Sequence, residues 1–384
     1  MRPLHAALIP LMFAHWVGWK ISLIYMLILA TLFLLTKLIN GRLYLHKVLL
    51  GILLFCAFFL AVNLTYIFEQ NTDLVFSNLH LYLSLFLVVA FILFSSPWNT
   101  SEIYIGARAI FWIAFYVLIV EFLAVNFLGI SKEIMPGVRY SPSYFEDLSG
   151  WHRPFGLTGQ ASANGGILLL SFLLLVEFRV IDVKSVFALL LGVLLTMSGQ
   201  AILSTALILG LLQLNKIRRW LFKSIFVLVF SSFIFFVLNL DLHQKISLDY
   251  LYYVLLDKAH LAENLDVLNS WQLLWGTLGL VAAEEGYGTE VFLIQSIRLF
   301  GVIFTILFWL FVWFLVKMAR LKFIWFICCF VTSLHYPTVL YIEAQLILAL
   351  LYLSTLLNSN PLTPKTIQEI KTIPAPYSSG QNPV

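Results

Sequence analysis

Charged residues are scarce in this sequence. Asp, Glu, Lys and Arg make up 11% of its 384 residues, whereas hydrophobic residues make up 61%. The mean hydropathy is +0.95. A soluble domain cannot bury so much apolar surface, so the composition predicts a protein embedded in a bilayer. The net charge of +4 is too small to indicate a nucleic-acid partner.

Cysteine is scarce as well. The chain has three cysteines, and each lies in an apolar stretch: Cys56, Cys328 and Cys329. This placement predicts free thiols rather than disulfides or metal ligands. No cluster of His, Cys and Asp has metal-ligand spacing, and no glycine-rich loop follows a strand-like run. The sequence therefore predicts neither a metal nor a cofactor.

Apolar runs fill the rest of the chain. A transmembrane helix needs about 20 apolar residues, and this length predicts an all-α, polytopic integral membrane protein with about twelve spans. They would form one domain, residues 1–357, followed by a flexible cytoplasmic tail, residues 358–384. The predicted spans are residues 4–19, 21–39, 48–68, 79–96, 107–130, 161–180, 184–198, 200–215, 221–240, 291–316, 321–336 and 338–357.

Two of these spans are short and adjacent. Residues 184–198 and 200–215 are separated only by Ser198-Gly199-Gln200, which predicts a tight turn. A short helix pair that ends below the membrane surface leaves a depression above it. Irregular backbone at that depth requires protein or a water-filled cavity around it.

Basic residues predict the orientation. With alternating spans, most basic clusters fall on one side, which the positive-inside rule assigns to the cytoplasm together with both termini. Two longer connections, residues 131–160 and 240–290, then face outward. The clusters on the predicted inner side are Lys37, Arg42 and Lys47; Arg179 and Lys184; Lys216, Arg218, Arg219 and Lys223; and Lys317, Arg320 and Lys322.

The first outer loop, residues 131–160, combines arginines with aromatic rings. Arg139 and Arg153 alternate with aromatic side chains that include Tyr144 and Trp151. Rings suit stacking on sugars, and a guanidinium suits phosphate. The loop therefore predicts a site for a sugar that carries phosphate. Alternatively, its rings lie at the membrane interface and its arginines pair with acidic residues of the same loop.

The second outer loop, residues 240–290, is acidic. Its residues 248–268 show helical apolar spacing, which predicts a short amphipathic helix on the membrane surface. Glycines between 276 and 288 precede the next span. The loop is either a solvated connection or a mobile lid over a lipid-linked substrate.

These segments together resemble the bacterial O-antigen polymerases and the related ligases. Residues 153–162 read Arg-Pro-Phe-Gly-Leu-Thr-Gly-Gln-Ala-Ser and lead into a span, as a family segment with an Arg, a Gly and a Glu-Pro-Ser-like tripeptide does. Here Gln160-Ala161-Ser162 stands in place of that tripeptide. Residues 195–201 and 271–301 are similar to further family segments, and Arg139 with Gly150 fits an Arg-x10-Gly spacing.

The resemblance implies transfer of a glycan from undecaprenyl diphosphate to the acceptor sugar of another lipid-linked repeat, at the periplasmic face of the bacterial inner membrane. An arginine fork meets the charge of the diphosphate without a metal, and a general base accepts the hydroxyl proton. We assign the diphosphate to Arg153 with Arg139 as helper. His335 is our candidate for the base, with His260 or the Glu284–Glu285 pair as alternatives.

Further residues complete the expected site. An ionisable residue inside a span is a candidate for function, which applies to Arg298, although Arg298 could instead extend toward the surface or pair with Glu290. Glu343 could orient an arginine, whereas Glu121 is expected to be a packing polar group without a catalytic role. The predicted substrate-binding residues are Arg298, Gln160, Tyr144, Trp151, Glu285 and Glu290.

Two other functions stay open. A ligase would transfer the glycan to lipid A core, and a transporter would move the lipid-linked oligosaccharide across the membrane. Secondary carriers often have internal repeats and a site near the midplane, and we find no repeated half in this chain. The expected partners of a polymerase are the undecaprenyl-diphosphate-linked oligosaccharide and membrane lipids, with a chain-length regulator and a flippase as further candidates.

Overall fold

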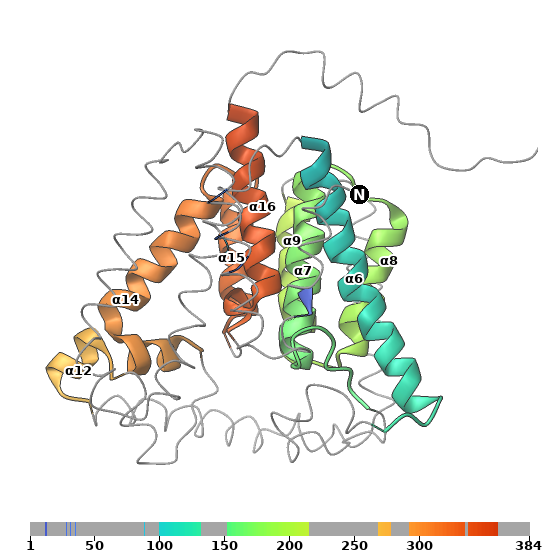
Figure 1. Ribbon diagram of the computed structural model, residues 1–384, viewed down its shortest axis with the longest axis horizontal. Helices are drawn as coiled ribbons and strands as arrows, with labels where there is room; N and C mark the ends of the chain where they lie inside the picture. Colours follow the sequence, from blue (N-terminus) through green and yellow to red (C-terminus); the bar gives the residue numbers. More distant parts are fainter. Residues whose placement is uncertain are drawn as a thin grey trace, which may run out of the picture.

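The computed structural model is all-helical over the residues that it describes, which are 100–131, 152–214, 268–277, 292–334 and 337–359, with single residues before position 100. Figure 1 shows their arrangement. The elements are α6 (Thr100–Asn126), α7 (Ala161–Glu177), α8 (Val183–Leu195), α9 (Gly199–Leu214), α12 (Ser270–Trp275), α14 (Phe292–Val316), α15 (Lys322–Thr332), a 3-10 turn η4 (Thr338–Leu340) and α16 (Ile342–Ser359).

These helices lie where the apolar runs predicted spans. The predicted spans between 107 and 215 and between 291 and 357 each coincide with one helix, and the all-α prediction is confirmed for the described residues. α12 falls inside the second predicted outer loop. The predicted spans before residue 100, the span at 221–240, the amphipathic helix at 248–268 and the tail lie outside the described ranges.

Two of the described helices are long and apolar enough to cross a membrane. They are α6, with a mean hydropathy of 2.1 over its best window, and α14, with 2.7. The other apolar helices in the described part are shorter. Large apolar side chains are nevertheless exposed on several helices, including Val120 on α6, Phe187 on α8, Leu203 on α9 and Leu310 on α14.

α7 is the central helix of the bundle. Every residue of α7 except Ser162 and Glu177 is buried, and α7 packs against α6, α8, α9, α15 and α16. A helix that is apolar on all sides is stable only when other helices surround it. The sequence of α7, which is apolar from Ile167 to Val176 except for Ser171, therefore accounts for its place.

Short connections make neighbouring helices antiparallel, so the bundle has two distinct ends. We call the loop end the one where α6 ends, α7 begins, α8 turns into α9 and α15 leads into α16; it is the lower end in Figure 1. The opposite end holds the connections 178–182 and 317–321. The basic residues Arg179, Lys184, Lys317, Arg320 and Lys322 belong to this opposite end, as the alternating spans predicted; which side of a membrane it faces stays a prediction.

A carboxylate holds the opposite end together. Glu177, the last residue of α7, accepts hydrogen bonds from the backbone N–H groups of Arg320 (2.6 Å) and Leu321 (3.3 Å) and from the indole N–H of Trp325 (3.2 Å). The Arg320 guanidinium in turn donates to the carbonyl of Val176 (2.8 Å). The connection between α14 and α15 is thereby fixed to the end of α7.

α14 is not one straight helix. Gly301 has φ 78° and ψ 167°, and these angles interrupt the helix between the segments 292–300 and 302–316. The break exposes the carbonyl of Arg298, which accepts hydrogen bonds from the backbone and hydroxyl of Thr277 (3.0 Å each). A side chain at Gly301 would collide with the backbone of Leu274, so only glycine fits where α12 packs against the break.

Candidate functional site

The loop that carries Arg153 is anchored by a carboxylate inside α6. Glu121 is 2% exposed. Its Oε1 accepts from the backbone N–H of Phe155 (2.7 Å), and its Oε2 accepts from that of Gly156 (2.6 Å). A buried carboxylate is tolerated when several donors surround it. Residues 154–159 are themselves buried, so this loop is an inserted part of the bundle rather than a surface connection.

His152 adds further bonds to the same anchor. Its ring Nε2 lies 3.0 Å from Glu121 Oε1. Its backbone N–H donates to the side-chain oxygen of Asn126 (2.7 Å), and the Asn126 amide donates to the His152 carbonyl (3.1 Å). The ring also meets the Phe155 ring edge to face, with centroids 5.1 Å apart. Two residues of α6 thus hold the residue that precedes Arg153.

Asn164, on the first turn of α7, fixes the other half of the loop. Its amide donates to the carbonyl of Phe155, and its side-chain oxygen accepts from the backbone N–H of Thr158 (3.3 Å). Gly156 has φ +58°, and a side chain there would overlap the Asn164 amide. Glycine is therefore required at position 156 for two reasons, its backbone conformation and the lack of space.

Arg153 connects this loop to the turn between α8 and α9. Its Nε donates to the carbonyl of Thr196 (3.2 Å), and its side chain is half-buried. Thr196 is fully buried, and its hydroxyl donates to the carbonyl of Val193 (2.7 Å). The guanidinium therefore lies at the loop end, between the start of α7 and the end of α8.

Hydrogen bonds continue from the α8–α9 turn to α15. Ser198 donates through its hydroxyl to the Ser162 hydroxyl (2.8 Å) and accepts from the backbone N–H of Ala201 (3.3 Å). Gln200 donates to the carbonyls of Val331 (3.1 Å) and Thr332 (3.2 Å). A tight turn is thus present, but it lies at residues 196–198 rather than 198–200, because Gly199 and Gln200 begin α9. The turn joins three helices by polar contacts at the loop end.

The structure describes three of the predicted site residues. Arg153 and Gln160 belong to one loop, and Gln160 precedes α7 without capping it through its side chain. Arg298 lies just before the break in α14, a helix that packs against α12, α15 and α16. Its side chain is 3% exposed, so it does not extend to the surface. The predicted residues Arg139, Tyr144, Trp151, Glu285, Glu290 and His335 lie outside the described residues, as do His260 and Glu284.

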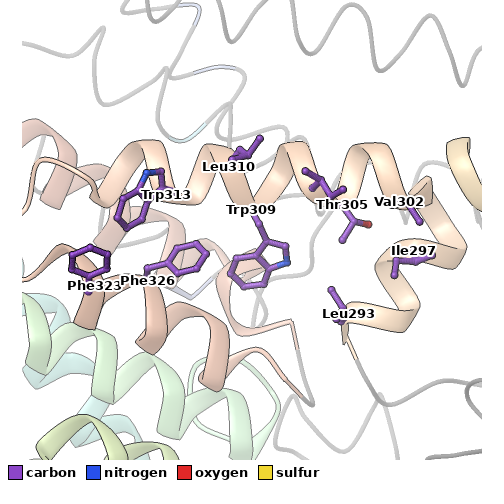
Figure 2. Close-up of a pocket in the computed structure, with 10 residues that line it drawn as sticks. Leu293, Ile297, Val302, Thr305, Trp309, Leu310, Trp313, Phe323 and Phe326 are labelled. Carbon is purple, nitrogen blue, oxygen red and sulfur yellow. The ribbon is translucent and has the colours of Figure 1, made fainter. Parts of the chain in front are cut away.

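An apolar groove runs along α14 beside α15. Its volume is about 570 Å³. Figure 2 shows Leu293 and Ile297 on the segment before the break, and Trp309 and Trp313 on the segment after it, with Phe326 of α15 opposite. Among the described residues that line it, the side chains are aliphatic or aromatic except that of Thr305. The groove thus follows the outer face of α14 from the loop end toward the opposite end.

Sequence reasoning assigned no role to Glu121, and the structure makes it the anchor of the Arg153 loop. The sequence did contain an indication of this role, because a carboxylate deep in an apolar helix is energetically costly and is therefore expected to have a specific structural or functional role. Glu343 differs: it is 0% exposed, and its two carboxylate oxygens accept no hydrogen bond from a described residue. The expectation that Glu343 orients an arginine therefore has no contact in support.

Within the described ranges, no three side chains of His, Cys, Asp or Glu gather in a way that could hold a metal ion; the prediction of metal-independent chemistry stays a prediction.

Comparisons of the chain with models of known protein families, with curated proteins and with solved structures find no match. The function must therefore be argued from the geometry of the site.

Proposed function

We propose that this protein is a polysaccharide polymerase of the bacterial inner membrane. It transfers a glycan from undecaprenyl diphosphate to the acceptor sugar of another lipid-linked repeat at the periplasmic face. The observation that carries the proposal is Arg153, a permanent cation half-buried at the end of an apolar bundle and oriented by the carbonyl of Thr196. A guanidinium presents a planar fork of N–H donors that matches phosphate oxygens, so it suits the anionic headgroup at the end of an apolar lipid.

The membrane location is supported by the helices themselves. α6 and α14 have the length and composition to cross a bilayer. Apolar side chains such as Val120, Phe187 and Leu310 are exposed along several helices, and water does not favour such surfaces. A lipid-linked substrate would approach the loop end from within the same bilayer, with its anionic headgroup at the level of Arg153.

The proposed reaction is a direct displacement. The acceptor hydroxyl oxygen bonds to the anomeric carbon while the bond from that carbon to the diphosphate oxygen breaks. The hydroxyl proton passes to a general base, for which His335 remains our candidate, and undecaprenyl diphosphate leaves. A guanidinium has five N–H donors in a planar fork that matches phosphate oxygens. In this reaction Arg153 stabilises the charge that develops on the leaving diphosphate.

The arginine fork can be tested by substitution. Arg153→Ala removes charge and donors, and we expect synthesis to fall by at least about 100-fold. Arg153→Lys keeps the charge without the fork and should also lose most activity. The matched control is Arg108→Ala, because Arg108 is an exposed arginine of α6 outside the proposed site. Protein level and membrane insertion are measured for each variant by immunoblotting. Wild-type chain lengths in Arg153→Ala would contradict the assignment.

A deletion strain distinguishes the three candidate functions. Lipopolysaccharide that carries a single repeat per core indicates a polymerase. Lipopolysaccharide without any repeat indicates a ligase, provided that the lipid-linked glycan accumulates on the outer leaflet. Accumulation on the inner leaflet indicates a transporter. The first result supports the proposal, and the other two overturn it.

A further inference from the structure

One buried side chain bonds to the Arg153 loop on both sides of Arg153. Glu121 contacts three points of the loop: the ring of His152 and the backbone N–H groups of Phe155 and Gly156. These points lie on both sides of Arg153 in the sequence. Movement of the loop away from α6 would break all three bonds together.

The chemistry of these contacts requires a carboxylate. Both backbone groups are donors, and each points at a different oxygen of Glu121. An amide in the same place would present an N–H to one of them, so two donors would face each other. A buried donor that loses its acceptor is destabilised by about 1–3 kcal/mol. We therefore expect the loop to adopt another conformation in such a variant.

We infer that Glu121 is a positioning residue for Arg153. Its carboxylate holds residues 152–156 against α6 and thereby places the guanidinium against Thr196, where the proposed diphosphate headgroup is met. This inference rests on the proposed function for its consequence in catalysis. The placement itself does not depend on that function and can be measured separately.

The chain offers a matched control at its opposite end. Glu177 is also a glutamate that accepts two backbone N–H groups from a connection between helices, those of Arg320 and Leu321. It does so far along α7 from the Arg153 loop. Glu177→Gln therefore reproduces the chemical change without disturbing the loop that carries Arg153.

The first experiment measures loop position without requiring activity. Arg153→Cys is introduced alone and together with Glu121→Gln or Glu177→Gln. The labelling rate of the new thiol by a charged, membrane-impermeant reagent is then measured in membranes, with the wild-type protein as the background from native thiols. We expect Glu121→Gln to change the rate at least threefold and Glu177→Gln to leave it unchanged. An unchanged rate with Glu121→Gln would overturn the inference.

Should Glu121→Gln fail to accumulate, Glu121→Asp is used in the same measurement. It keeps the carboxyl group but is shorter by one methylene group, so it cannot reach both backbone N–H groups. We expect the same direction of change in the labelling rate. A rate equal to that of Arg153→Cys alone would again contradict the inference.

The second experiment uses synthesis as its readout. Glu121→Gln should lower turnover by about 30-fold with a smaller change in KM, because the loop still exists but its arginine is misplaced. Combining it with Arg153→Lys should lower turnover little beyond Arg153→Lys alone, since coupled residues give non-additive effects. Multiplicative effects would show that Glu121 acts independently of Arg153. Because labelling needs no product, loss of the proposed function and loss of the positioning role give different results.

Discussion

The two ends of the helical bundle use the same chemistry in different surroundings. At the loop end, Glu121 accepts two backbone N–H groups and is buried. At the opposite end, Glu177 also accepts two backbone N–H groups but is only partly buried, next to exposed Arg320. The helix caps follow the same division: Ser198 at the start of α9 is buried, whereas Asp182 at the start of α8 is exposed.

The difference in burial decides whether a polar contact fixes the position of a connection or only joins two helices. An exposed polar contact can be replaced by water, so its loss is cheap and the chain tolerates alternatives. A buried polar contact has no such replacement, so it allows one arrangement only. The loop end is therefore the end where geometry is enforced, and it is also the end that carries Arg153.

The largest expected difference is between Glu121→Ala and Glu177→Ala. Removing Glu121 leaves buried donors without an acceptor, and we expect a loss of stability of about 3–5 kcal/mol. Removing Glu177 lets water reach the backbone N–H of exposed Arg320 but leaves the buried indole N–H of Trp325 without its acceptor, and we expect a smaller loss of about 2 kcal/mol. Unfolding of both variants in the same detergent measures the difference. Equal losses would contradict the distinction between the two ends.

Glycine substitutions probe the break in α14. Gly301→Ala places a side chain at φ 78° against the backbone of Leu274, and a strained residue of this kind costs about 1–3 kcal/mol. The control is Gly210→Ala in α9, where nothing lies within 4 Å of the added methyl group. Alanine favours helix over glycine by up to about 1 kcal/mol. Thermal midpoints should therefore fall for the first variant and rise for the second; the reverse order would rule out the described break.

Substitutions at the two helix caps are expected to reduce stability by a smaller amount. Ser198→Ala removes the hydroxyl that accepts from Ala201 and donates to Ser162, and Asp182→Ala removes the acceptor for the backbone N–H of Ser185 (2.7 Å). Each substitution should cost about 1 kcal/mol of stability. Only Ser198→Ala should also reduce synthesis, because Ser198 adjoins the turn that receives Arg153. A loss of synthesis in Asp182→Ala at equal protein level would argue against this division.

The smallest expected effect is a pH dependence of stability that arises from Asp182 at the opposite end. Burial alone would raise the pKa of Asp182, but hydrogen bonds from Ser185 outweigh it, and the pKa lies below its usual value. A carboxylate with a lowered pKa stabilises the fold above its unfolded pKa and loses this contribution as the pH falls through the folded pKa. The stability difference between wild type and Asp182→Ala should therefore shrink on acidification below about pH 4. A difference that grows instead would contradict the assigned contacts.

Much of the fold could be predicted from local patterns. Apolar runs located the helices between 100 and 214 and between 292 and 359, and Ser198-Gly199-Gln200 marked the turn between α8 and α9 to within two residues. These patterns succeed because long apolar runs favour helices and turn residues interrupt them. The break at Gly301 was missed, since a glycine within an apolar run is compatible with a continuous helix until another backbone packs against it.

The candidate site was only partly accessible to sequence reasoning. Arg153 and Arg298 stood out because charge is rare in this chain. The residues that hold the Arg153 loop could not be assigned to it from the sequence: Glu121 lies 32 positions before Arg153, and Thr196 lies 43 positions after it. Nothing local to Arg153 indicates either residue, because their proximity depends on α6, α7 and α8 packing side by side.

The sequence by itself determined where the described apolar helices lie along the chain, since hydrophobic length and turn residues act locally. Only the tertiary structure decided that Glu121, Asn164 and Thr196 meet around the Arg153 loop. The physical reason is that a buried donor or acceptor must find a partner within hydrogen-bonding distance, and the packing of distant helices decides which partner that is.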